Sequence, residues 1–340
     1  MTMKKMGILG CGDFLRWMAP GIKKSTSLEV AKLYDPDKSR AEHYADKLGG
    51  VAVDDDTEIM EDDSIEIVAL FVPPWIRRKL IDRATAAGKH ILTTKPLGPN
   101  MEDCKAMVEA VEKAGVQCGV IYRRTDCAPV ETYKTIFESG EIGNLALFKE
   151  DWLHHYPEWN QWATDPERNG GPFMDAMIHN MNIARYLMGR PPKSVAYFSE
   201  DYAHPDIKCN DTEFMKLNFA GGSAHLFITW AADLEVFSKE GNDREHIDII
   251  YMVTDQGWRL TEGEGPKGFT ITASKEGETK QWVAESLAQT TFDAFVDGIE
   301  SDGENWPRDL PTIREAYEDI KILRDAEKNI GQTIDVDLSL

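Results

Sequence analysis

The chain has 340 residues, a length that predicts two domains or one large one. Its 38 Lys and Arg against 59 Asp and Glu give a formal charge of −21, so we expect no binding to nucleic acid or to an anionic membrane surface. The longest apolar stretch, 65–73, is far shorter than the roughly 20 residues of a membrane-spanning helix. No signal peptide is visible, and five cysteines without metal-like spacing favour a reducing compartment, so we expect a cytoplasmic protein.

The first third of the sequence alternates short apolar runs with helical patterns. Strands are expected at 6–9, 29–34, 65–72, 90–93 and 116–122, and helices at 14–25, 39–48, 75–87 and 101–114. This alternation predicts a doubly wound parallel sheet of the Rossmann type. The run 54–63 holds seven acidic residues, which is typical of a solvated helix start rather than of a metal site.

The pattern changes after about residue 125. A helix is expected at 129–139, a strand at 145–153 and a glycine-led helix at 170–187. Further strands follow at 193–198, 213–219, 223–231, 246–254, 257–261 and 269–273, before helices at 287–300 and 312–329. Consecutive strands without intervening helices predict a large, open, mainly antiparallel sheet. We therefore expect an α/β fold with a Rossmann domain at 1–125 and an α/β domain at 126–340, whose last helix packs back on the first domain.

A glycine turn follows the first expected strand. Gly10 permits a tight turn, and Gly12 lets the backbone approach a pyrophosphate at the start of the next helix. The third glycine of a dinucleotide fingerprint is replaced by Leu15, but Asp35 ends the second strand at about the expected distance. A carboxylate there accepts hydrogen bonds from ribose hydroxyls and repels a 2′-phosphate, which favours NAD over NADP. The alternative is that Asp35 only caps the turn before Pro36.

Five further segments carry recognisable patterns in a fixed order. They are Val72-Pro73-Pro74, resembling TPxxxH; 88–98, resembling GKHVxxEKP; 119–124, resembling GFxRR; 140–143, resembling GxIG; and 170–179, resembling GGGxLxDxGxH. Together they resemble the Gfo/Idh/MocA family, the relatives of glucose-fructose oxidoreductase and inositol dehydrogenase, over most of the chain.

This resemblance implies a Rossmann domain, a second domain with a large open sheet that binds substrate and forms oligomers, and NAD(P)-dependent oxidation or reduction of a sugar or polyol carbon. The catalytic positions of the family fall on Lys95, Asp175 and His179. The cofactor side comprises Gly10, Gly12, Asp13, Phe14, Asp35, Val72, Pro73, Thr94 and Lys95.

Three residues depart from the family patterns. Thr94 stands where a glutamate precedes the lysine, Arg77 where a histidine follows the proline, and Asn182 where an acid often follows the histidine. Thr94 can still bond a backbone or ribose group, but it holds no charge.

The oxidation of an alcohol, which the resemblance implies, requires a general base. Hydride transfer from a secondary alcohol leaves a hydroxyl proton, and His179, with an ordinary pKa near ~6.5, suits its removal. Asp175 lies four residues earlier, on the same face of a helix, and could bond substrate hydroxyls or orient the imidazole. Lys95 follows a strand, at the sheet edge where ligands of α/β proteins bind. The alternative for each is structural: a packing histidine, an Asp175–His179 bond and a surface lysine.

The segment 152–162 is dense in aromatic and imidazole side chains. Such side chains suit a sugar, which offers apolar CH faces and hydroxyls, although loop packing is the alternative. Adjacent histidines on a strand point to opposite faces and cannot share one ion, so no metal site is expected. The substrate-binding candidates are Tyr122, Arg123, Trp152, His154, His155, Tyr156 and Trp162. Arg124 lines the same cleft or forms a buried ion pair.

The sequence therefore predicts an NAD-dependent dehydrogenase acting on a secondary hydroxyl of a sugar, sugar acid or cyclitol. One alternative is redox-neutral glycoside cleavage through transient sugar oxidation with the same cofactor. A second is a non-catalytic NAD-binding sensor. The expected partner is a small carbohydrate. A sheet with helices on only one side leaves an apolar face to cover, so a homodimer or homotetramer is also expected.

Overall fold

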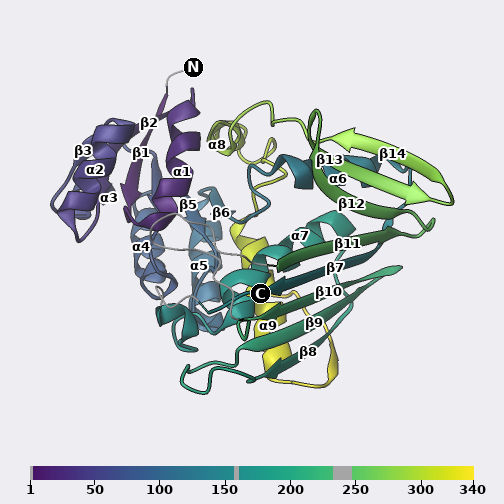
Figure 1. The fold of residues 1–340 in the computed structure, drawn as a ribbon. Coiled ribbons are helices and arrows are strands. Elements are labelled where there is room, and N and C mark those ends of the chain that lie inside the picture. The colour runs from purple at the N-terminus through teal and green to yellow at the C-terminus, as the bar shows by residue number, and fades with distance from the viewer. Residues whose placement is uncertain (1–2, 157–160, 233–246) are drawn as a thin grey trace. The chain divides into compact units, whose positions relative to one another are not determined.

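The computed structural model describes residues 3–156, 161–232 and 247–340, and the chain divides into two compact units (Figure 1). Unit 1 comprises Met1–Asp126 and Leu287–Tyr317, and unit 2 comprises Cys127–Ser286 and Glu318–Leu340.

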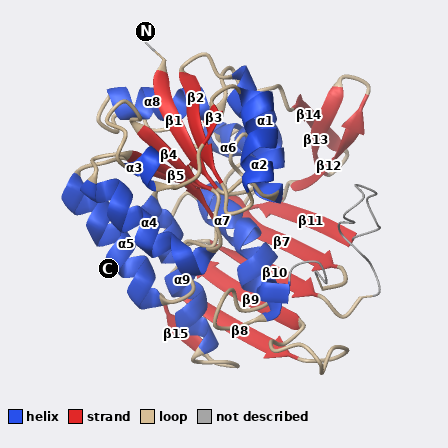
Figure 2. Ribbon diagram, turned by 90° about the vertical axis from the view of Figure 1, so that its left-hand side faces the viewer, coloured by secondary structure: helices blue, strands red, loops and turns tan. Residues whose placement is uncertain are grey.

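Unit 1 is built on a parallel sheet whose six described strands have the order β3-β2-β1-β4-β5-β6. Its elements are β1 (Lys4–Leu9), α1 (Asp13–Lys24), β2 (Leu28–Tyr34), α2 (Lys38–Leu48), β3 (Val51–Ala52), α3 (Thr57–Met60), β4 (Ile67–Leu70), α4 (Pro74–Ala86), β5 (His90–Thr94), α5 (Met101–Ala114), β6 (Cys118–Ile121) and α8 (Thr291–Glu300). Figure 2 shows α1 and α2 on one side of these strands and α4 and α5 on the other. This order is that of a Rossmann fold, so the predicted doubly wound sheet is confirmed.

The elements of unit 1 follow from local sequence. All four residues of β4 are buried, as expected of a central parallel strand. Helix α5 begins where the Asn100 side chain accepts from Asp103 N and ends at Gly115, whose φ of 67° suits a glycine.

Helix α8 returns to unit 1 from late in the sequence. The side chain of Phe292 is buried in the same core as the first strands. The Asp293 carboxylate accepts from Ser25 Oγ at 2.6 Å and from the backbone N–H groups of Thr26 and Ser27 at 2.9 and 3.0 Å. These bonds fix α8 to the turn between α1 and β2.

Unit 2 contains a sheet whose nine described strands have the order β14-β13-β12-β11-β7-β10-β9-β8-β15. Its elements are α6 (Ala128–Ser139), β7 (Leu145–Leu153), the 3₁₀ turn η1 (Gln161–Thr164), the π-helix η2 (Phe173–Met177), α7 (Ile178–Met188), β8 (Ser194–Glu200), β9 (Thr212–Phe219), β10 (Gly222–Thr229), β11 (Ile247–Thr254), β12 (Arg259–Gly265), β13 (Gly268–Lys275), β14 (Glu278–Val283) and β15 (Thr333–Asp335). Only β7 and β10 pair in parallel among these strands, so the mainly antiparallel sheet is confirmed.

Several boundaries differ from the expected ones. The expected helix 170–187 is a π-helix followed by an α-helix, and β14 and β15 were not expected. The first residue of the strand expected at 246–254 lies outside the described residues. Helix α9 (Ile313–Glu327) begins in unit 1, and its residues from Glu318 onward belong to unit 2.

The sheet of unit 2 has one face covered by helices, since α7 packs on β7 and β10, and α6 on β13. Side chains alternate accordingly: Met252 of β11 is buried, whereas Ile249 and Tyr251 of the same strand are exposed, as is Phe198 of β8. No helix among the described residues is long and apolar enough to cross a membrane.

Candidate functional site

The glycine turn after β1 is the first part of the site. Gly10 has a φ of 93°, and a Cβ at this position would lie 2.3 Å from the carbonyl oxygen of Phe71, so the backbone requires glycine there. Gly12 differs, because it has a φ of −86° and a Cβ added to it would meet nothing within 4 Å. The backbone therefore tolerates a side chain at Gly12, and the space before the N-terminus of α1 is open to a phosphate.

Asp35 connects this turn to the end of β2. Its carboxylate accepts from the backbone N–H of Cys11 at 2.8 Å and of Asp37 at 2.9 Å. The second bond is the turn cap considered above, and the first directs the half-buried carboxylate toward the glycine turn. Burial raises the pKa of the Cys11 thiol to about 12, so this cysteine stays neutral beside Asp35.

The other residues expected on the cofactor side near this turn differ in their exposure to solvent. Asp13 is exposed at the first position of α1. The ring of Phe14 packs against that of Phe71, 5.1 Å away. Val72 and Pro73, which follow β4, are half-buried.

Arg77 holds together the loops that follow β4 and β5. Its guanidinium is buried and donates to the carbonyl oxygens of Val72 at 2.7 Å and of Leu97 at 3.1 Å, and to that of Pro96. Burial lowers its pKa to about 10, which still leaves the side chain charged at neutral pH. Arg77, which departs from the family pattern, thus fixes the backbone directly after the candidate catalytic lysine and links it to the loop at Val72.

Lys95 is half-buried at the carboxyl end of β5, and its backbone N–H donates to the Ile121 carbonyl at 3.3 Å. The preceding Thr94 is buried, and its Oγ1 donates to the same carbonyl at 3.3 Å. The Thr94 hydroxyl, expected to face a backbone or ribose group, is engaged with the backbone of β6.

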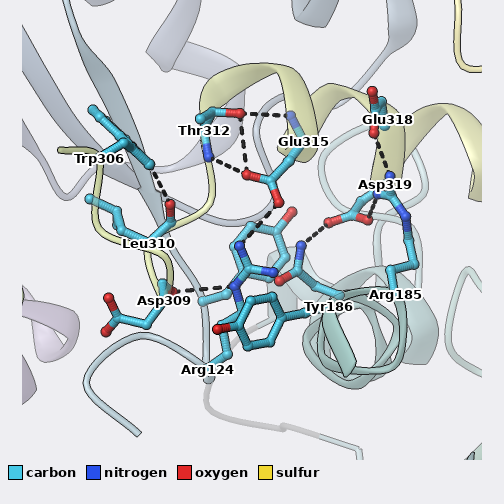
Figure 3. A network of polar contacts seen from close by, with 12 residues as sticks. Arg124, Arg185, Tyr186, Trp306, Asp309, Leu310, Thr312, Glu315, Glu318 and Asp319 are labelled. Atoms are coloured by element: carbon cyan, nitrogen blue, oxygen red, sulfur yellow. Dashed lines mark hydrogen bonds and ion pairs between the residues drawn. The ribbon is translucent and has the colours of Figure 1, made fainter. Parts of the chain in front are cut away.

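The three residues after β6 have different surroundings. Tyr122 is buried and Arg123 is exposed. Arg124 is buried, and it donates from Nε to the Asp309 carbonyl at 3.3 Å and from a terminal nitrogen to Glu315 at 3.1 Å (Figure 3). Of the two roles considered for Arg124, the structure shows the buried ion pair.

Asp175 and His179 lie in unit 2, on η2 and on the first turn of α7. From Gly171 to Ala184, every residue is buried except these two, which are partly exposed. Within 171–184, they are thus the two residues that reach the surface. Met174, directly before Asp175, and Met177, between the two, are fully buried.

The asparagine at position 182, where the family pattern often has an acid, is explained by its contact with Asp319. It is buried and donates from Nδ2 to Asp319 at 2.6 Å. Figure 3 shows that Asp319 also pairs with Arg185, which reaches Glu318 as well. An acid at position 182 would place a carboxylate against the buried Asp319 carboxylate, so the amide suits this environment better.

Aromatic and imidazole side chains at the end of β7 and directly after it form two ring clusters. Trp152 and His154 lie 5.4 Å apart, and His154 lies 6.3 Å from Trp230. His155 instead lies 4.5 Å from Tyr156 and 4.9 Å from His204.

The adjacent histidines thus join different clusters. Trp162 is half-buried in η1, and 157–160 lie outside the described residues. Within 3–156, 161–232 and 247–340, no group of three or more His, Cys, Asp and Glu could hold a metal ion.

Three residues of unit 2 were missed by the sequence reasoning. Asn169 donates to Asp175, Glu213 accepts from the backbone N–H of Phe173 at the start of η2, and His204 joins the second ring cluster. Burial raises the pKa of Glu213 to about 8. The only available signal was the position of Asn169 directly before the glycine pair.

Both halves of the chain match models of one family. Residues 4–122 match the model described as "Oxidoreductase family, NAD-binding Rossmann fold", and residues 130–243 match the GFO/IDH/MocA C-terminal domain. The chain belongs to the GFO/IDH/MocA oxidoreductase family.

The individual relatives share about a third or less of the aligned residues with this chain. Scyllo-inositol 2-dehydrogenase (NAD(+)) of Bacillus subtilis (strain 168) is 34% identical over 226 residues, covering 62% of this chain and 64% of that one. The 1,5-anhydro-D-fructose reductase of Ensifer adhaerens is 26% identical over 309 residues, covering 89% and 90%.

The chain spans about three fifths of the length of the first curated relatives that it matches. An oxidoreductase from Agrobacterium radiobacter, solved in complex with NAD+, L-tartaric acid and magnesium, has a TM-score of 0.77 at 19% identity over 98% of this chain and 99% of that one. This likeness shows that the fold is shared.

Proposed function

We propose that this family member is an NAD-dependent dehydrogenase that moves hydride between a secondary hydroxyl of a sugar, sugar acid or cyclitol and nicotinamide. Family membership supports the reaction class. The names of two relatives, a dehydrogenase of scyllo-inositol and a reductase of 1,5-anhydro-D-fructose, support a cyclic polyhydroxylated substrate.

The observation that carries the proposal is the exposure pattern of η2 and α7. Asp175 and His179 alone reach the surface in a stretch of otherwise buried residues, four positions apart. His179 would remove the hydroxyl proton, and Asp175 would bond the substrate or orient the imidazole.

The residues present fit a nicotinamide dinucleotide. Gly12 leaves room at the N-terminus of α1 for the pyrophosphate, and Asp35 presents a carboxylate beside that turn for the ribose hydroxyls. When bound, the nicotinamide ring exchanges the hydride. Because a carboxylate repels a 2′-phosphate, NAD is favoured over NADP.

Lys95 completes the proposed catalytic set. It follows β5, between backbone groups bonded by Thr94 and Arg77, at the carboxyl end of the sheet, where ligands of α/β proteins bind. There it would polarise the substrate oxygen or relay the proton. The two ring clusters at the end of β7, together with Tyr122 and Arg123, are the proposed substrate contacts.

We also propose that the exposed face of the sheet in unit 2 is covered by a second copy of the chain. Phe198, Ile249 and Tyr251 are large apolar or aromatic side chains exposed there. Light scattering that gives a monomer mass at micromolar concentration would refute this proposal.

The test of the reaction is the appearance of NADH when the protein is mixed with NAD and a panel of inositols, aldoses and sugar acids. We expect turnover with at least one member of the panel, and its loss in His179→Ala and Lys95→Ala. The exposed residues His43 and Lys105 provide matched controls, since His43→Ala and Lys105→Ala should retain activity.

Two other results would replace the proposal. Release of a chromogenic aglycone without net NADH would indicate glycoside cleavage through transient oxidation. NAD binding without turnover of any panel member or glycoside would indicate a sensor.

A further inference from the structure

Asn169 lies directly before the two glycines that lead into η2, and its side chain is fully buried. Its amide nitrogen Nδ2 donates to Oδ1 of Asp175 at 3.1 Å and to the carbonyl oxygen of Ala163 at 3.4 Å. In the pattern GGGxLxDxGxH, which this segment resembles, the first glycine falls on position 169. The chain therefore places an amide donor beside Asp175 where a glycine would have no side chain.

The orientation of this amide is fixed by its neighbours. Both groups that face Nδ2 are acceptors, so a flipped amide would place oxygen against oxygen. The other amide atom, Oδ1, is buried without a hydrogen-bond partner in the described part of the chain. An unsatisfied buried acceptor costs free energy, so the donor bond that holds this amide in place offsets part of that cost.

The backbone that carries Asn169 is held as well. Its N–H donates to the Asp165 carbonyl at 2.9 Å, and its own carbonyl accepts from Arg324 of α9 at 3.2 Å. Gly170, with a φ of 105°, lets the guanidinium approach, because a Cβ there would lie 3.1 Å from an Arg324 nitrogen. Arg324 is held in turn by Glu327 at 2.7 Å. The donor therefore approaches Asp175 from a rigid support.

We propose that Asn169 is a positioning residue, which holds the Asp175 carboxylate by Oδ1 and so directs its second oxygen toward the alcohol substrate. A carboxylate rotates readily about its last bond, and catalytic rates are sensitive to small errors in orientation. The inference rests on the proposed function, since it assigns Asn169 to the reaction of that site.

The test compares two buried asparagines of unit 2. Asn169→Ala removes the donor to Asp175, whereas Asn182→Ala removes a similar donor to Asp319, which has no proposed part in the reaction. With the alcohol found in the panel, we expect Asn169→Ala to lower kcat by about tenfold with KM for NAD unchanged. Both variants should lower the unfolding temperature by similar amounts, since each removes one buried donor. Asn182→Ala should nevertheless leave kcat within about twofold of the wild type. Equal kcat losses in the two variants would overturn the inference.

A second measurement does not need turnover. The unfolding temperatures of Asn169→Ala, Asp175→Ala and the double variant form a cycle. If the amide holds the carboxylate, the double variant loses less than the sum of the single losses, and additive losses overturn the inference. A wild type that oxidises no alcohol of the panel refutes the proposed function alone, and the cycle then still decides whether Asn169 holds Asp175.

Discussion

Gly10 and Gly12 lie two residues apart in one turn, yet the structure predicts opposite consequences for an added methyl group. In Gly12→Ala, φ is −86° and the new Cβ meets nothing within 4 Å, so stability should stay within about 0.5 kcal/mol of the wild type. The same methyl group would occupy the space before the N-terminus of α1. If a pyrophosphate binds there, the affinity for NAD should fall by about tenfold or more, a loss of about 1.4 kcal/mol.

Gly10→Ala is the matched perturbation. Its Cβ would lie 2.3 Å from the Phe71 carbonyl oxygen at a φ of 93°, so strand β1 or the chain after β4 must shift. Backbone strain of this kind costs about 1–3 kcal/mol before the clash is counted, so we expect a loss of about 3 kcal/mol. For a unit of this size the unfolding temperature should fall by roughly 6–12 °C.

The assay is NADH binding, followed by fluorescence, together with thermal unfolding of both variants. We expect a stable Gly12→Ala protein that binds NADH poorly and a destabilised Gly10→Ala protein. The reasoning would be refuted by a Gly12→Ala variant that binds NADH as the wild type does. It would equally be refuted if that variant lost as much stability as Gly10→Ala.

Three further perturbations test other parts of the site. Arg77→Ala removes three charge-assisted bonds to carbonyls, each worth about 1.5–3 kcal/mol, but also a buried cation, so urea unfolding should show a net loss of about 3 kcal/mol and the KM for NAD should rise. Asp35→Asn removes the charge that repels a 2′-phosphate, so the ratio of kcat/KM for NADP to that for NAD should rise by about tenfold. Burial raises the pKa of Glu213 to about 8, so between pH 4.5 and 8 the folded state holds a proton that the unfolded state has lost, and stability should fall as pH rises. Because burial also raises the pKa of Glu327, Glu213→Gln should reduce the pH slope without abolishing it.

The regular elements of the fold could be predicted where one local pattern determined them. The buried run of β4 and the capped helix α5 needed no distant information. Strand β14 was missed because it carries little apolar alternation, and its residues are exposed or half-buried. Strand β15 has three residues, and its pairing with β8 depends on the course of the chain after α9.

The residues of the candidate site likewise differ in whether a local pattern of the sequence was enough to find them. Gly10, Gly12 and Asp35 could be found because one strand-turn-helix-strand unit contains them all. The roles of Arg77 and Asn169 could not be found in this way. A buried guanidinium and a buried amide acquire a role from the acceptors around them, and the sequence alone does not show which carbonyls or carboxylates those are.

The three departures from the family patterns have a common physical explanation. Thr94 bonds the backbone of β6, Arg77 bonds the carbonyls of two loops, and Asn182 bonds Asp319, which lies 137 residues further along the chain. Each of the three is buried, and each is accounted for by an internal bond. Asp175 and His179, by contrast, match the pattern and reach the surface of their helix. A protein that had lost its chemistry would be free to vary at these two positions first, so the departures do not favour the sensor over the dehydrogenase.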